Sequence, residues 1–118
     1  MAYKDPREPF SRINVDEAKA MITGGSAVVI DVREPHEYAA AHVPGAKLIP
    51  VNTIINHKDE IPDAGDLVFI CAVGQRSALA CEYAAALGKQ NLYNVEGGTD
   101  AWVRAGLPVE TGAPAVAR

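Results

Sequence analysis

The sequence predicts an α/β fold in which one mostly parallel sheet carries helices on both faces. Two short apolar runs, Ala27–Val32 and Leu67–Ile70, contain several β-branched residues and are typical of strands that are buried on both faces. Segments of good helix formers follow such runs, and this alternation indicates parallel strands joined by crossover helices. With 118 residues and 48% hydrophobic content, the chain has the size of one domain with its own core.

The first half of the chain is expected to contain three strands and three helical segments. Residues 1–11, rich in proline and charge, are expected to form a flexible N-terminal arm. The strands are predicted at Ile13–Val15, Ala27–Val32 and Lys47–Ile49. The helical segments are predicted at Asp16–Met21, with Asp16 as the cap, at Glu34–Ala41, with proline near its start, and at 51–57.

The second half of the chain is expected to repeat the alternation twice. Leu67–Ile70 and Asn91–Val95 are the predicted strands. The helix after the first strand spans Ser77–Leu87, with Ser77 at the N-cap and a glycine just beyond its end. Thr99 or Asp100 is expected to cap the last helix, and residues 113–118 are expected to form a disordered tail.

Composition argues against several classes of function. The net charge is −4 and neither sign is concentrated in a block, so neither nucleic acid nor an anionic membrane is an expected partner. No segment approaches the roughly 18 apolar residues that cross a bilayer, and we expect a cytoplasmic protein. The two cysteines and three histidines lack the spacing of a disulfide framework or a metal site, so no metal and no cofactor is expected.

The segment Cys71–Ser77 has the composition of an anion-binding loop. It joins a buried strand to a helix, and such a loop directs unpaired backbone N–H groups and the positive end of the helix dipole at one point. A cysteine in that environment can have its pKa lowered from about 8.5 to roughly 3.5–7.5, which makes it a nucleophile at neutral pH. We expect Gly74 to adopt a positive φ there, and Arg76 to hold an oxyanion beside the sulfur.

A plain structural interpretation of Cys71 competes with this one. A cysteine at the end of a strand is most often a small buried hydrophobic residue. Here the cysteine is followed within six residues by glycine, arginine and serine, an unusual composition for a core segment. This pattern favours a reactive thiol, open to a small donor, whereas Cys81 is expected to lie in the core.

Three separated stretches together resemble single-domain rhodanese-like sulfurtransferases. They are Asp31–Tyr38 with Ala41–Ala46, Cys71–Ser77, and Glu96–Trp102 with Ala105–Pro108, so the implied domain covers residues 12–112. The resemblance implies a rhodanese-like fold, with a five-stranded mostly parallel sheet and helices on both faces. It also implies that Cys71 is the catalytic residue and that the substrate-binding residues are Ala72, Val73, Gly74, Gln75, Arg76 and Ser77.

The activity implied by the resemblance is transfer of sulfane sulfur through a persulfide on Cys71. The partners implied are a small-molecule sulfur donor such as thiosulfate and a thiol or cyanide acceptor, with a sulfur-relay protein as an alternative partner. The loop lacks the residues typical of the thiosulfate and mercaptopyruvate enzymes, which leaves the donor open. Asp31 and Arg33 are expected to pair with each other, and His42 to tether its turn by a hydrogen bond.

Two other kinds of protein share parts of this pattern. Cysteine phosphatases of the cell-division-cycle type, and the related arsenate reductases, also place a cysteine and an arginine in a loop around an anion. Those phosphatases have five residues between the two, whereas Cys71 and Arg76 enclose four, which gives a smaller cradle. Many rhodanese-like modules are instead regulatory binding domains, usually without the cysteine, or persulfide carriers that work with a protein partner. The carrier alternative stays open.

Overall fold

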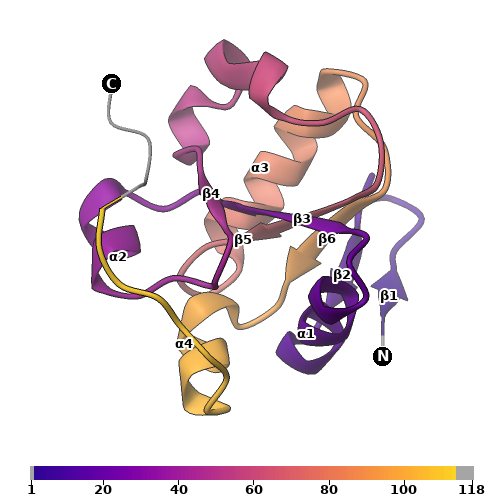
Figure 1. The fold of residues 1–118 in the computed structure, drawn as a ribbon. Coiled ribbons are helices and arrows are strands. Elements are labelled where there is room, and N and C mark those ends of the chain that lie inside the picture. The colour runs from indigo at the N-terminus through magenta and orange to yellow at the C-terminus, as the bar shows by residue number, and fades with distance from the viewer. Residues whose placement is uncertain (1, 114–118) are drawn as a thin grey trace.

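A six-stranded sheet forms the centre of the structure, a computed structural model that describes residues 2–113 (Figure 1). The strands are β1 (Tyr3–Lys4), β2 (Ser11–Ile13), β3 (Ala27–Asp31), β4 (Lys47–Leu48), β5 (Asp66–Ile70) and β6 (Leu92–Val95). Their order across the sheet is β1-β2-β6-β5-β3-β4. Only β1 runs antiparallel to its neighbour; the other pairs are parallel.

The fold class predicted from the sequence is confirmed, but the strand count is six rather than five. The extra strand, β1, lies in residues 1–11, which the sequence predicts to be a flexible arm. Tyr3 and Lys4 are exposed, yet they pair with Arg12 and Ser11, so the hydrogen bonds of the main chain hold this segment at the sheet edge. Propensity arguments missed it because an exposed two-residue edge strand has no apolar alternation.

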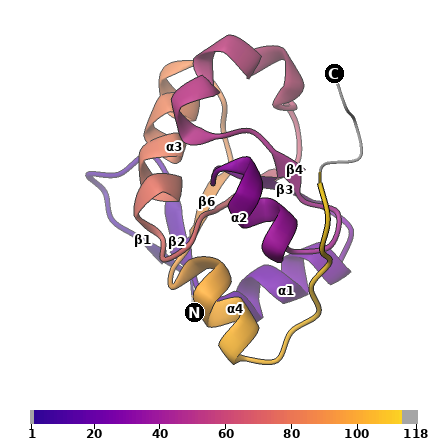
Figure 2. The same cartoon turned by 90° about the vertical axis from the view of Figure 1, so that its left-hand side faces the viewer.

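Helices cover both faces of the sheet, as the views in Figures 1 and 2 show. They are α1 (Val15–Thr23), α2 (Pro35–Ala40), α3 (Gln75–Ala86), α4 (Gly98–Arg104) and two 3₁₀ segments, η1 (Val51–Thr53) and η2 (Ile55–Glu60). One core cluster joins Phe69 of the sheet to α3 and η1–η2, through Ala80 and Ile54. The other joins Val68 and Ile70 to α1, α2 and α4, and contains the fully buried Trp102.

Several helix ends differ from those predicted. The cap of α1 is Asn14 rather than Asp16, because Asn14 and Glu17 form a reciprocal capping box. The segment after β4 forms 3₁₀ turns rather than a regular helix. The last helix is capped by Gly97, at φ 80°, rather than by Thr99 or Asp100.

The parallel register brings the carboxyl ends of the central strands to one edge of the sheet. Asp31 of β3 is paired with Ile70 of β5, and β6 lies on the other side of β5. The loop that follows Ile70 is therefore flanked by residues that follow β3 and β6, the arrangement in which open parallel sheets place their ligands. Within residues 2–113, no helix is long and apolar enough to cross a membrane. Of the predicted tail 113–118, residues 114–118 lie outside the described residues.

Candidate active site

A tight loop connects Cys71, at the end of β5, to the start of α3. The turn depends on Gly74, which has φ 103° and precedes the first helical residue, Gln75. A Cβ atom on residue 74 would lie 3.3 Å from the carbonyl oxygen of Val95, so the loop is also pressed against the end of β6. Helix α3 begins two residues before the predicted start, and Ser77 consequently lies in its first turn instead of capping it.

The sulfur of Cys71 is surrounded by hydrogen-bonding groups of its own loop. The backbone N–H of Gly74 donates to Sγ at 3.1 Å, and the hydroxyl of Ser77 lies 3.2 Å from Sγ. Burial by itself raises the pKa of Cys71, but hydrogen bonds from the Ser77 hydroxyl and from the backbone of Ser77, Gly74 and Val73 outweigh it. The pKa of Cys71 is therefore lowered from its ordinary value.

Asn94 of β6 controls the direction of the Ser77 hydroxyl. Its side-chain NH₂ donates to the carbonyl oxygen of Gly74 and to the carboxylate of Glu96, both of which can only accept. This fixes Oδ1 toward Ser77, whose hydroxyl donates to it. A serine hydroxyl carries one proton, so Asn94 and a Cys71 thiolate compete for the same donor.

Sequence reasoning missed the role of Asn94. The sequence signal was a polar residue near the end of the predicted strand Asn91–Val95, and the structure shows that Asn94 is fully buried there.

The accessibility of the sulfur corrects one expectation. The sequence predicts a thiol that is open to a small donor, whereas Cys71 is 1% exposed and belongs to the core cluster beneath α3. The side chain of Val73, at the tip of the loop, is 52% exposed. In this structure the residue that carries Sγ is therefore closed to solvent, beside an exposed loop tip.

Arg76 also differs from its predicted role beside the sulfur. Its two Nη atoms donate to the two carboxylate oxygens of Glu37 in α2, at 2.8 and 3.0 Å. The hydrogen bonds from Arg76 lower the pKa of Glu37 to about 2, so this pair is ionised at neutral pH. In this structure the guanidinium ties α3 to α2, because the Glu37 carboxylate accepts a hydrogen bond from each of its outer nitrogens. The contribution of Glu37 was not foreseen from the sequence.

The remaining residues of the predicted loop have different environments. Gln75 is exposed at the start of α3, and Ala72 is half-buried. The backbone N–H of Thr99 donates to the carbonyl of Cys71 at 2.8 Å, and that of Asp100 donates to Ala72 at 3.0 Å. The first turn of α4 thereby holds the main chain of Cys71 and Ala72 in place through two hydrogen bonds.

Gly98 makes this close approach of α4 possible. A Cβ atom on it would lie within 2.6 Å of the carbonyl carbon of Ala72, and its φ is +57°. No side chain fits at this position without displacing the loop.

Asp31, Arg33 and His42 support the architecture around the loop. Asp31 is fully buried and accepts hydrogen bonds from the backbone N–H, Nε and Nη2 of Arg33, which is the pairing expected from the sequence. The ring of His42 stacks on that of Tyr38 at 3.6 Å, and its Nδ1 lies 2.7 Å from the Tyr38 carbonyl oxygen. None of the hydrogen bonds of these residues within the described chain involves Cys71.

The second cysteine and the histidines do not extend the site. Cys81 is fully buried in α3, and burial raises the pKa of its thiol. In the described part of the chain, no three His, Cys, Asp or Glu side chains are grouped as metal ligands would be. The arrangement therefore offers one acidified cysteine in a ring of hydrogen-bond donors, which suits covalent transfer of a small group.

The sequence is similar to known sulfurtransferases and rhodanese-like domains. A sequence model described as the rhodanese-like domain matches residues 14–105. A sulfurtransferase from Allochromatium vinosum is 38% identical over 82 residues, which cover 70% of this chain and 77% of that protein.

Solved structures with the same fold cover most of the chain. A rhodanese-related protein from Thermoplasma volcanium has a TM-score of 0.77 at 32% identity, covering 84% of this chain and 96% of its own. A rhodanese-like domain protein from Staphylococcus aureus has a TM-score of 0.76 at 35% identity, covering 86% and 98%. A Rhodopseudomonas palustris protein of unknown function, described as a possible tyrosine phosphatase, has a TM-score of 0.74 at 27% identity, covering 84% and 83%.

Proposed function

Because the chain belongs to the rhodanese-like domain family, we propose that it is a sulfurtransferase that carries sulfane sulfur as a persulfide on Cys71. The observation that carries the proposal is the set of hydrogen bonds to Sγ, from Gly74 and Ser77, at the carboxyl end of a central strand. They favour an anionic sulfur in a loop too small for a bulky ligand. A relative at 38% identity is named a sulfurtransferase, which supports the general activity.

The proposed cycle has two displacement steps. In the first, the Cys71 thiolate attacks the outer sulfur of a donor such as thiosulfate; a new S–S bond forms, the old one breaks, and sulfite leaves with the electron pair. In the second, an acceptor such as cyanide or a thiolate attacks the outer sulfur of the persulfide. The S–S bond to Sγ breaks, and Cys71 leaves as the thiolate, so the cycle needs no external oxidant or reductant.

The loop is suited to both anionic states of this cycle. The groups that lower the pKa of Cys71 are already directed at the sulfur before the reaction, so stabilising charge there requires little reorganisation. The overall charge of −4 does not attract an anionic donor. Discrimination in favour of small anions therefore rests on the local N–H groups of Ala72 to Ser77.

The test is the intact mass of the protein after incubation with thiosulfate. One sulfur atom adds roughly 32 Da as a persulfide. Cys71→Ser should abolish this adduct, whereas Cys81→Ser, the matched control at a fully buried thiol, should retain it. If no sulfur donor adds mass at Cys71, the protein is not a sulfurtransferase of this type.

A second candidate, a persulfide carrier charged by a protein partner, is favoured by the closed sulfur. Cys71 is 1% exposed, and a docking protein could open the loop at the exposed Val73. Comparing thiosulfate with a persulfidated cysteine desulfurase as donors separates the two. If only the persulfidated desulfurase loads sulfur onto Cys71, the chain is a carrier. If thiosulfate loads Cys71 rapidly, the chain is an enzyme that uses small donors.

A further inference from the structure

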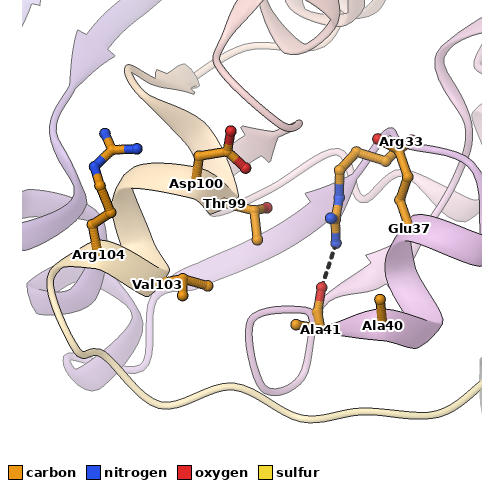
Figure 3. Close-up of a pocket in the computed structure, with 8 residues that line it drawn as sticks. All are labelled: Arg33, Glu37, Ala40, Ala41, Thr99, Asp100, Val103 and Arg104. Carbon is orange, nitrogen blue, oxygen red and sulfur yellow. Dashed lines mark hydrogen bonds between the residues drawn. The ribbon is translucent and has the colours of Figure 1, made fainter.

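A pocket of about 330 Å³ lies between α2 and α4, beside the Cys71 loop (Figure 3). One wall comes from α2 and the residues that flank it, and the other from α4. The lining residues are Arg33, Glu37, Ala40, Ala41, Thr99, Asp100, Val103 and Arg104. The pocket has no role in the two displacement steps of the proposed cycle.

Two groups on the wall of the pocket are suited to bind a carboxylate. Thr99 is 4% exposed, and its hydroxyl has no hydrogen-bond partner in the structure. Arg33 uses Nε and Nη2 for Asp31 and the carbonyl of Ala41, but Nη1 has no hydrogen bond within residues 2–113. Of the two, the Thr99 hydroxyl is the buried polar atom that is left without a partner. Such atoms are rare in native proteins, so it indicates an acceptor oxygen of a ligand, for which Nη1 of Arg33 is a second donor.

The other charges of the pocket suit a ligand that carries both signs, because Arg104, on the same helix as Asp100, also lines it and has no ion pair in the described part of the chain. Glu37 is neutralised by Arg76, and Arg33 by Asp31. The carboxylate of Asp100 has no ion pair or side-chain hydrogen bond in the described part of the chain, and it can receive an ammonium group. The short apolar side chains of Ala40, Ala41 and Val103 leave room for an aliphatic stem.

Residues on both sides of the pocket form hydrogen bonds with the Cys71 loop. Thr99 and Asp100, which line it, donate their backbone N–H groups to Cys71 and Ala72 at 2.8 and 3.0 Å. On the opposite side Glu37, which also lines it, holds Arg76 at the far end of the loop. A ligand in the pocket therefore contacts residues that hold the main chain of Cys71 and Ala72.

We propose that this pocket binds the carboxylate and ammonium groups of a small amino-acid thiol, such as cysteine, that accepts sulfur from Cys71. The identity of the acceptor rests on the proposed function, but the binding site does not. In the transfer, the acceptor thiolate attacks the outer sulfur of the persulfide and forms a new S–S bond. The bond to Sγ breaks, and its electron pair leaves with Cys71.

Binding can be measured without turnover by NMR titration of the intact chain with S-methylcysteine, which has no free thiol. Two truncated probes separate the charged groups: 3-(methylthio)propionate lacks the ammonium, and 2-(methylthio)ethylamine lacks the carboxylate. We expect saturable shifts of the Thr99 and Asp100 amide signals, with S-methylcysteine binding more tightly than either truncated probe. Equal affinities for the three probes, or no saturable shift, would overturn the proposal.

Variants assign the contacts one at a time. Thr99→Val keeps the shape of the side chain and should weaken S-methylcysteine and the propionate by about three- to tenfold, the ratio that one hydrogen bond contributes. Thr99→Ser, which keeps the hydroxyl, should restore that affinity. Asp100→Asn should weaken only the two probes that carry an ammonium group. Asp59→Asn, an exposed carboxylate on η2, is the control and should change none of the three.

The outcomes separate this proposal from the proposed function. If thiosulfate adds no sulfur to Cys71 but the probes bind in the expected order, the pocket stands and the acceptor role fails. If the persulfide forms but Thr99→Val leaves all affinities unchanged, the pocket assignment is wrong and the proposed function stands.

Discussion

Replacing Ser77 with alanine should raise the pKa of Cys71 by about one unit. A hydrogen bond to a charged group contributes about 1.5–3 kcal/mol, and one pKa unit corresponds to about 1.4 kcal/mol, which gives about one to two units for a full hydrogen bond. The structure argues for the lower end of this range. The single Ser77 proton is shared with Asn94, and the N–H of Gly74 still donates to Sγ in the variant.

The measurement is the pH dependence of the alkylation rate at Cys71, followed by intact mass with iodoacetamide. The thiolate is the reacting species, so the midpoint of the profile reports the pKa. Ser26→Ala is the matched control, because the Ser26 hydroxyl donates to the carboxylate of Asp66, at the opposite end of β5 from Cys71. The same profile in both variants would refute the role assigned to Ser77.

A substitution of Asn94 should shift the pKa of Cys71 in the opposite direction. Asn94→Val removes the acceptor that competes for the Ser77 proton, so the hydroxyl can donate fully to the thiolate and the pKa of Cys71 should fall. The same change removes the hydrogen bond to the Gly74 carbonyl, and a loosened loop would raise the pKa instead. The sign of the shift therefore decides whether Asn94 acts through the proton of Ser77 or only through the shape of the loop.

Three further perturbations follow from the packing and charges around the loop. Gly98→Ala should lower the free energy of unfolding, measured with urea, by about 2–4 kcal/mol, because the added Cβ atom meets the Ala72 backbone. Gly88→Ala is the control: this glycine also has a positive φ, +88°, but open space around it, so the free energy of unfolding should fall by less. Glu37→Gln should cost under about 1 kcal/mol, since the ion pair is partly exposed. The pKa of Glu37 is lowered from 4.5 to about 2, so this difference should be full above pH 4.5 and vanish as the pH falls to 2; a constant difference would contradict the ion-pair assignment. Native alkylation should modify Cys71 before Cys81, because the pKa of Cys71 is lowered and that of Cys81 is raised; equal rates of modification at the two thiols would contradict this difference in acidity.

The sheet and the position of the nucleophile could be predicted because local patterns specify both. Apolar, β-branched runs such as Leu67–Ile70 are typical of central strands, and a cysteine that follows such a strand in a parallel sheet lies at its carboxyl edge. The positive φ of Gly74 could also be predicted, because a tight strand-to-helix turn needs a residue that adopts it easily.

The partners of the loop residues could not be predicted, because they depend on side-chain contacts between distant segments. Arg76 was assigned to an oxyanion from its neighbourhood in the sequence, yet the carboxylate that binds it is Glu37, on a helix defined far earlier in the chain. Ser77 looked like a cap by composition, but the helix starts earlier and its hydroxyl turns inward to Sγ and Asn94. Burial of the sulfur likewise depends on how closely the loop is packed, which no residue pattern encodes.

The two main-chain hydrogen bonds from Thr99 and Asp100 to Cys71 and Ala72 have a consequence for biosynthesis. The cysteine leaves the ribosome well before the segment that fixes its carbonyl group. Until α4 docks, that thiol should behave like any cysteine of an unfolded chain, with an ordinary acidity. A nascent chain stalled before Gly98 should thus be no more reactive than a peptide, so chemical competence at this sulfur arrives only when the last helix is in place.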